Sequence, residues 1–149
     1  QHIMRLEPQK FVELALPFCT KAGLEDTPQL REVLPAVQTK VQLLSETPAW
    51  VKWVQTLEYE EESMAKLQEN AREMLSLLAG AFAGIEEWSG EAAFQLIKPL
   101  AKENGVKVGA MMFPLRMALT GCHAGPGIDV VMQTLGRDEV LRRISIFPC

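Results

Sequence analysis

The sequence lacks most of the residue patterns from which enzymes build an active site. Its 149 residues include only two histidines and three widely spaced cysteines: His2, His123, Cys19, Cys122 and Cys149. No CxxC or HxxxH spacing occurs, so we expect free thiols, with zinc binding by these side chains as the alternative. No GxGxxG or GKS/GKT phosphate loop is present. We therefore predict that the chain itself is not catalytic and holds neither a metal nor a cofactor.

Long hydrophobic stretches are also absent. No run of about 18 or more apolar residues occurs, which predicts that no segment spans a membrane. Residues 1–5 lack the basic region and apolar core of a signal peptide, and no initiator Met precedes them, as expected for a piece of a longer chain. An odd number of cysteines argues against a disulfide framework. These absences together indicate a protein of the reducing cytoplasm.

Acidic side chains outnumber basic ones, but the excess is unevenly distributed. The formal net charge is −4, and 48% of the residues are apolar, enough for a buried core. Residues 53–103 carry four Lys or Arg against ten Asp or Glu, whereas residues 104–149 carry five against three. A mildly positive region in an acidic protein suits recognition of a few nucleotides better than broad binding to a nucleic-acid backbone.

The apolar spacing predicts an all-α fold of about eight or nine short helices. β-branched residues are sparse and no segment alternates apolar and polar residues over a useful length, so we expect almost no sheet. Gly105, Gly121 and Gly136 each follow a helical pattern, where a positive φ is needed. The expected helices cover residues 8–21, 28–45, 47–54, 58–80, 90–104, 128–135, and 138–144 with Asp138 as its cap. Between 104 and 128 we expect a short helix from residue 107, a kink at Pro114 and a further helix to residue 120. No heptad pattern is sustained, so we expect a monomer.

Residues 105–136 stand out within this helical pattern. Arg116 is the only charged residue between Lys107 and Asp129, and a GPG turn follows at residues 125–127. An isolated cation among apolar neighbours is either tied to a buried partner or held out for a ligand. We place this stretch in a second helical subdomain, residues 53–149, which follows a first helical subdomain, residues 1–52.

Four segments of this region resemble the C-terminal anticodon-binding region of bacterial glutamyl-tRNA synthetases. They are NGVKVG at 104–109, FPLRMALTG at 113–121, GPG at 125–127 and LGRDEVLRRI at 135–144. They match the family pattern GxKxG…PLRxALTG…PG…LG(K/R)(E/D)xxLxR, and weaker similarity extends over nearly the whole chain. No HIGH or KMSKS sequence occurs, so the resemblance implies that ATP and Mg bind in a catalytic domain outside this chain.

The resemblance implies an α-helical cage of the class I synthetase type, made of two small subdomains, that reads the YUC anticodon of glutamate tRNA. By its place in the motif, Arg116 contacts the first anticodon base. Gly125, Pro126 and Ile128 match the loop against which the first and second bases pack. Lys40 falls where the third base is read. An arginine fork suits a base edge, and single-stranded loops are read through such unstacked bases.

The sequence departs from the family at two of these positions. Family members often have Thr in place of Gly125, so a hydrogen bond to a base must come here from the backbone. An arginine at the position of Lys40 marks strict discrimination against glutamine tRNA, and lysine lacks its bidentate fork. Arg116 has an alternative role as a structural arginine that caps helix carbonyls, and Lys40 as a solvated lysine.

A second hypothesis needs no RNA. In it the chain is a stand-alone all-α scaffold that binds a protein partner through Met111, Met112, Phe113 and the tryptophans. Methionine clusters are usually core residues, but they also form adaptable contact surfaces. The remaining basic residues of the last helix suit either phosphate attraction or surface salt bridges: Arg137, Arg142 and Arg143.

Overall fold

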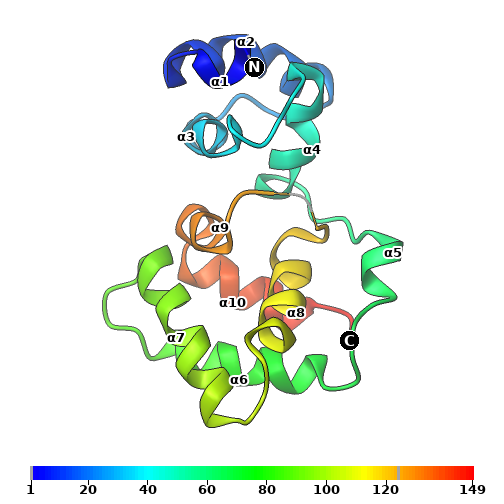
Figure 1. Cartoon of the computed structure of the whole chain (residues 1–149), viewed down its shortest axis with the longest axis vertical. Helices are drawn as coiled ribbons and strands as arrows, with labels where there is room; N and C mark the ends of the chain where they lie inside the picture. Colours follow the sequence, from blue (N-terminus) through cyan, green and yellow to red (C-terminus); the bar gives the residue numbers. More distant parts are fainter. Residues whose placement is uncertain (1, 124) are drawn as a thin grey trace. The chain divides into compact units, whose positions relative to one another are not determined.

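The computed structural model describes residues 2–123 and 125–149, and within them it contains helices and no strand, which confirms the all-α prediction (Figure 1). None of the described helices is long and apolar enough to cross a membrane. The helices, in chain order, are α1 (His2–Arg5), α2 (Pro8–Lys21), α3 (Pro28–Val37), the 3₁₀ helix η1 (Leu44–Glu46), α4 (Thr47–Val51), the 3₁₀ helix η2 (Lys52–Val54), α5 (Glu61–Met64), α6 (Ala71–Ala83), α7 (Gly90–Glu103), α8 (Val108–Thr120), α9 (Ile128–Leu135) and α10 (Arg137–Ile146).

The described residues form two compact units. The first unit comprises the chain up to Leu57 together with Gly125 and Pro126, and the second comprises residues 58–123 and 127–149. The subdomain boundary expected after residue 52 stays a prediction, because a compact unit is not by itself an independently folding domain.

The first unit is a small cluster of α2, α3 and α4, which contact one another pairwise. Phe11 of α2, Leu34 of α3 and Trp53 of η2 are fully buried in its core. α3 begins where the sequence predicts, because Thr27 accepts a hydrogen bond from the Leu30 amide at 3.1 Å and Pro28 follows as the first helical residue.

The expected helix over residues 28–45 is wrong in its second half, because α3 ends at Val37. The Gln38 side chain is buried and donates to the carbonyls of Ile3 and Leu6, both at 2.7 Å. Val41, beyond the turn, is also buried. These tertiary contacts outweigh the helical spacing of the sequence. Lys40 consequently lies in an exposed turn and not on a helix.

The second unit is a bundle in which α8 contacts α6, α7, α9 and α10. Met111, Leu115 and Leu119 of α8 are fully buried, so α8 supplies much of the core of this unit. Arg72 of α6 ties the C-terminal end of the chain to the bundle by donating to the Ile144 carbonyl at 3.0 Å and the Phe147 carbonyl at 2.5 Å.

Three expectations for this unit need correction. The helix expected over residues 58–80 is two helices, α5 and α6, separated by turns that hydrogen bonds from the Leu67 amide to the Met64 carbonyl and from the Ala71 amide to the Gln68 carbonyl close. α8 is one helix that continues through Pro114, and not two helices separated at that residue. α10 begins at Arg137 after Gly136, so Asp138 lies in its first turn and is not its cap.

Candidate nucleic-acid interface

Arg116 lies in the last turns of α8, where the helix stops abruptly. Gly121 ends α8 in the left-handed conformation, with φ of 75°, and its amide donates to the Met117 carbonyl at 2.8 Å. The Thr120 hydroxyl donates to the Arg116 carbonyl at 2.9 Å. Arg116 is half-buried, and this burial lowers the pKa of its guanidinium, with Cys122 acting in the opposite sense. The arginine remains a cation.

Arg143 of α10 holds the C-terminal end of α8 in place. The residue is 4% exposed, and its Nη1 donates to the Leu119 carbonyl at 2.7 Å. Its Nε donates to Glu139 at 2.7 Å, and Arg142 donates to the same carboxylate. Hydrogen bonds from Arg142 and then Arg143 lower the pKa of Glu139 to about 2, against the effect of partial burial. One carbonyl of the last turn of α8 is therefore satisfied by a fixed cation.

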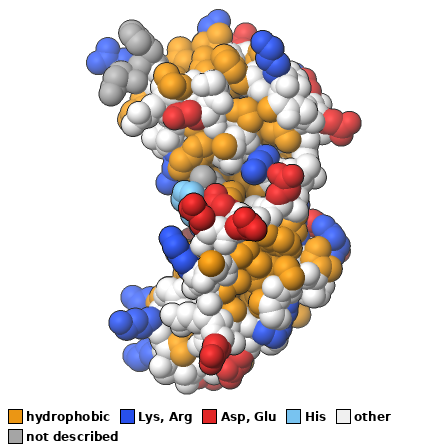
Figure 2. Space-filling model, turned by 90° about the vertical axis from the view of Figure 1, so that its right-hand side faces the viewer, with side chains coloured by type: hydrophobic (Ala, Val, Ile, Leu, Met, Phe, Trp, Pro, Cys, Tyr) orange, Lys and Arg blue, Asp and Glu red, His pale blue; other side chains and the backbone are white. Residues whose placement is uncertain are grey.

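Glu60 holds the segment that follows α8. Its amide donates to the Gly121 carbonyl at 2.7 Å, and its Oε1 lies 2.6 Å from His123 Nδ1. The same oxygen accepts a hydrogen bond from the Ser63 hydroxyl at 2.5 Å. These contacts, Ser63 first and His123 second, lower the pKa of Glu60. The Glu60–His123 contact is on the surface. On the face drawn in Figure 2, acidic and basic side chains are interspersed with hydrophobic ones.

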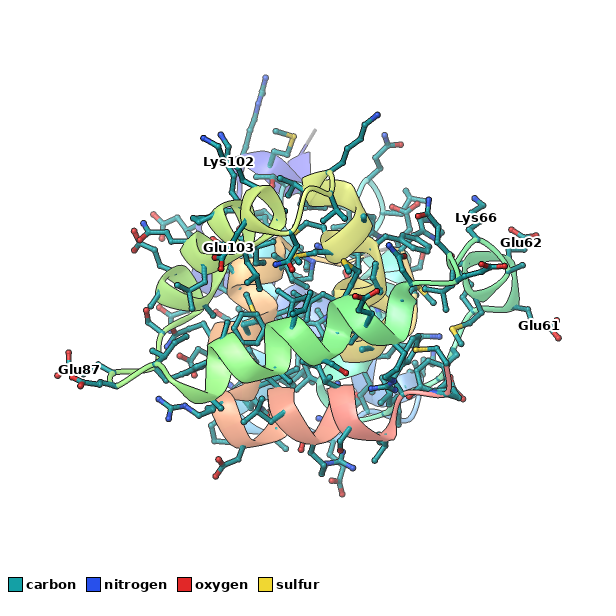
Figure 3. All side chains as sticks on the ribbon, turned by 90° about the horizontal axis from the view of Figure 1, so that it is seen from below. Glu61, Glu62, Lys66, Glu87, Lys102 and Glu103 are labelled. Atoms are coloured by element: carbon teal, nitrogen blue, oxygen red, sulfur yellow. The ribbon has the colours of Figure 1, made fainter. Side chains whose placement is uncertain are left out.

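Replacing Glu60 with alanine is expected to loosen residues 121–123 with only a small effect on global stability. Exposed ion pairs contribute about 0.2–1 kcal/mol, so the free energy of unfolding should fall by that amount. Hydrogen exchange of the 121–123 amides should become faster. Glu61→Ala is the matched control, because Glu61 is the exposed neighbour of Glu60 in the chain (labelled in Figure 3). Equal acceleration in both variants would show that Glu60 does not hold this segment.

The other predicted site residues are divided between the two units. Gly125 and Pro126 are buried in the first unit, which also contains the exposed Lys40. Ile128 begins α9 in the second unit, where Arg116 also lies. Ile128 is only 2% exposed, which leaves little of its side chain for a base to contact.

The residues of the scaffold hypothesis do not form an exposed surface. Met111 and Trp53 are fully buried, and Met112 and Phe113 are half-buried. Trp88 packs edge-to-face on Phe82, with ring centroids 5.8 Å apart. Met111 and Trp53 thus belong to the cores of their own units.

The arginines considered for phosphate attraction make structural contacts. Arg137 lies 5.8 Å above the Trp88 ring and donates to the Ile85 carbonyl. Arg142 is paired with Glu139, as the salt-bridge alternative expects, and Arg143 is buried.

The three cysteines are free thiols, as predicted. Cys19 and Cys122 are buried, and burial raises the pKa of Cys19 to about 11. Within residues 2–123 and 125–149 no group of three or more His, Cys, Asp or Glu side chains is placed to hold a metal ion.

The fold is that of the anticodon-binding region of tRNA ligases. Two solved structures of glutamate–tRNA ligases superpose on nearly the whole chain. The enzyme from Elizabethkingia meningosepticum gives a TM-score of 0.81 at 17% identity, and the match covers 97% of this chain and 30% of that enzyme. The enzyme from Elizabethkingia anophelis gives a TM-score of 0.74 at 19% identity, and the match covers 95% of this chain and 28% of that enzyme.

The sequence assigns the family. The model of the anticodon binding domain family matches residues 10–147, and the chain belongs to that family. It is 45% identical over 147 residues to a glutamate–tRNA ligase of Akkermansia muciniphila, covering 99% of this chain and 34% of the relative. It is 35% identical over 130 residues to one of Bradyrhizobium diazoefficiens, covering 84% and 27%. The chain thus spans about a third of the length of these relatives, and the resemblance seen in the sequence is confirmed.

Proposed function

We propose that this chain recognises the anticodon loop of glutamate tRNA as part of a glutamate–tRNA ligase. The observation that carries the proposal is the family match over residues 10–147, together with a 45% identical relative that is a glutamate–tRNA ligase. The parent enzyme attaches glutamate to tRNA at the expense of ATP. ATP and Mg are bound outside this chain, which works as a monomer in the cytoplasm and contributes recognition without chemistry.

Arg116 reads the first anticodon base in this proposal. Its guanidinium is a planar fork that can bond a base edge bidentately or stack on an unpaired base. The hydrogen bonds of Arg143 and Glu60 at the end of α8 support this role, because they fix the helix turn from which Arg116 projects. A fixed arginine loses less conformational entropy when it binds a base.

In this proposal Gly125, Pro126 and Ile128 support the loop at which the first and second bases are bound, because their burial leaves little of them for a base to contact. A glycine next to a proline gives such a loop a tight turn. Lys40 lies at the third base, and its exposure leaves its ammonium group accessible. Because a lysine offers no bidentate fork, we propose that the third base is read less strictly than it is by an arginine.

Titration of the chain with the anticodon stem-loop of glutamate tRNA tests the proposal. Arg116→Ala should weaken binding by about 1–3 kcal/mol, and the preference for the first base should be relaxed. Arg31→Ala is the control, because it removes the same charge from an exposed site whose arginine pairs with Asp26. Binding should weaken with salt as phosphate contacts are screened. Stem-loop affinity that is the same in Arg116→Ala and the unaltered chain would refute the assignment of Arg116.

A further inference from the structure

A groove of about 550 Å³ opens in the second unit between the start of α6 and the start of α8. Its floor includes the half-buried ring of Phe113 and the buried Pro114, both from α8. The volume is that of a small-molecule site, which typically combines an apolar surface with a few converging polar groups.

The charge of this groove is opposite to that of the unit around it. The second unit carries 13 Asp or Glu and nine Lys or Arg. The charged side chains of the groove, within the described residues, are Lys66 and Lys107, with no carboxylate. Neither lysine forms an ion pair with any described residue. Two unpaired ammonium groups at one apolar groove favour a ligand that is both anionic and partly apolar.

The polar residues at the N-terminal ends of α6 and α8 in the groove do not stabilise these helix ends. Lys107 is at the N-cap of α8, where the helix dipole disfavours a cation, and no acidic residue follows in the first turn. Asn70 is at the N-cap of α6, yet its side chain makes no capping hydrogen bond. The side-chain carboxamides of Asn70 and Gln68 make no hydrogen bond with residues 2–123 and 125–149. Locally unfavourable choices of this kind concentrate at functional sites.

We propose that this groove binds one nucleotide of single-stranded RNA. The base lies against Phe113, the amides of Gln68 and Asn70 reach its edge, and Lys66 and Lys107 neutralise the flanking phosphates. Stacking on an aromatic ring combined with basic side chains is the general chemistry of single-strand binding.

The position of the groove on α8 connects it to the anticodon site. Phe113 precedes Arg116 by three residues, so the two lie one turn apart on neighbouring parts of the same helix surface, about 4.5 Å along the axis. An RNA strand held at Arg116 can therefore place an adjacent nucleotide in the groove. The choice of RNA over another anionic ligand rests on the proposed function.

The test uses the 149-residue chain with a six-nucleotide single-stranded RNA and, separately, with the glutamate anticodon stem-loop. Amide chemical shifts of residues 66–71 and 106–114 report binding of the short RNA in the groove. The double variant Lys66→Gln/Lys107→Gln should lower the salt dependence, the slope of log affinity against log salt, by about 1.4 for the short RNA. Phe113→Leu should weaken binding by about 5- to 100-fold. Thermal unfolding checks that Phe113→Leu folds.

Lys102→Gln is the matched control. Lys102 is an exposed lysine at the end of α7. Lys66 lies in the segment between α5 and α6, and Figure 3 labels both side chains. It makes no side-chain ion pair with the described residues and does not line the groove. It should therefore change the affinity and the salt slope for the short RNA much less than the double variant does.

The outcomes separate this inference from the proposed function. Stem-loop binding that depends on Arg116 but is unchanged by Lys66→Gln/Lys107→Gln overturns the groove and leaves the proposed function intact. If the short RNA shifts the groove amides but the chain does not bind the stem-loop, the groove is supported and the proposed function is overturned. A polyglutamate peptide that shifts the same amides as strongly as the short RNA overturns the assignment to RNA.

Discussion

Replacing Gly121 with alanine is expected to lower the free energy of unfolding by about 2–5 kcal/mol. A left-handed backbone costs a residue with a side chain roughly 1–2 kcal/mol, and Gly121 has φ of 75°. A Cβ at this position would also overlap the carbonyl group of Glu58, which is backbone and cannot rotate away. Overpacking of this kind costs about a further 1–3 kcal/mol. Urea denaturation followed by circular dichroism measures the loss.

Gly105→Ala is the control for this prediction. Gly105 ends α7 with φ of 68°, but no atom lies within 4 Å of a Cβ built there. The variant therefore has only the conformational cost, about 1–2 kcal/mol. If both variants lost the same stability, the close approach of Gly121 to Glu58 would have no energetic weight. Because Gly121 follows the turn that carries Arg116, its replacement should also weaken stem-loop binding, which Gly105→Ala should leave unchanged.

Gly121 shows what a sequence can and cannot predict about this fold. Its position after a helical pattern predicts a positive φ, and the structure confirms it. The contact with Glu58 joins residues 63 positions apart, and no local pattern records it. Local signals report the conformation of a residue, whereas the cost of changing it depends on what the fold brings against it.

The limits of the helices were also predictable where local sequence sets them and not where other contacts do. α2, α7 and α9 lie within a residue of their expected limits. A first-turn proline begins α2, a capping serine begins α7, and the glycine of the GPG turn precedes α9. The error at residues 38–45 occurs where the Gln38 side chain donates to the distant carbonyls of Ile3 and Leu6 in preference to continuing a helix. The error at residues 65–70 occurs where the backbone forms turns, closed by hydrogen bonds from the Leu67 amide to the Met64 carbonyl and from the Ala71 amide to the Gln68 carbonyl. Periodicity alone cannot detect these bonds.

The candidate site was predictable only where composition marks it. Arg116 is recognisable as an isolated cation in an apolar run, and the motif around it indicates its role. Glu60 and Arg143 are ordinary charged residues of an acidic run and a basic helix. Their importance comes from contacts with His123 and with the Leu119 carbonyl, which only the folded chain creates.

Replacing Arg143 with alanine is expected to lower the free energy of unfolding by about 2–4 kcal/mol at neutral pH. Removing its guanidinium leaves the buried Leu119 carbonyl without this donor, which costs about 1–3 kcal/mol. The buried side-chain stem adds about 0.8 kcal/mol for each methylene that returns to water on unfolding. Arg142→Ala is the matched control, because it removes a neighbouring arginine that binds the same carboxylate from an exposed position. Denaturant unfolding of both variants gives the comparison.

The pH dependence of this loss separates the two partners of Arg143. The folded-state pKa of Glu139 is lowered to about 2 from an ordinary value of 4.5, so its contribution to stability is complete above about pH 4.5 and decreases as the pH falls toward 2. The destabilisation caused by Arg143→Ala should therefore shrink below pH 4.5, while the part that comes from the Leu119 carbonyl persists. A loss that disappears entirely in acid would mean that Glu139 alone accounts for the role of Arg143. A loss that persists should be accompanied by weaker stem-loop binding at neutral pH, because the freed end of α8 no longer fixes Arg116.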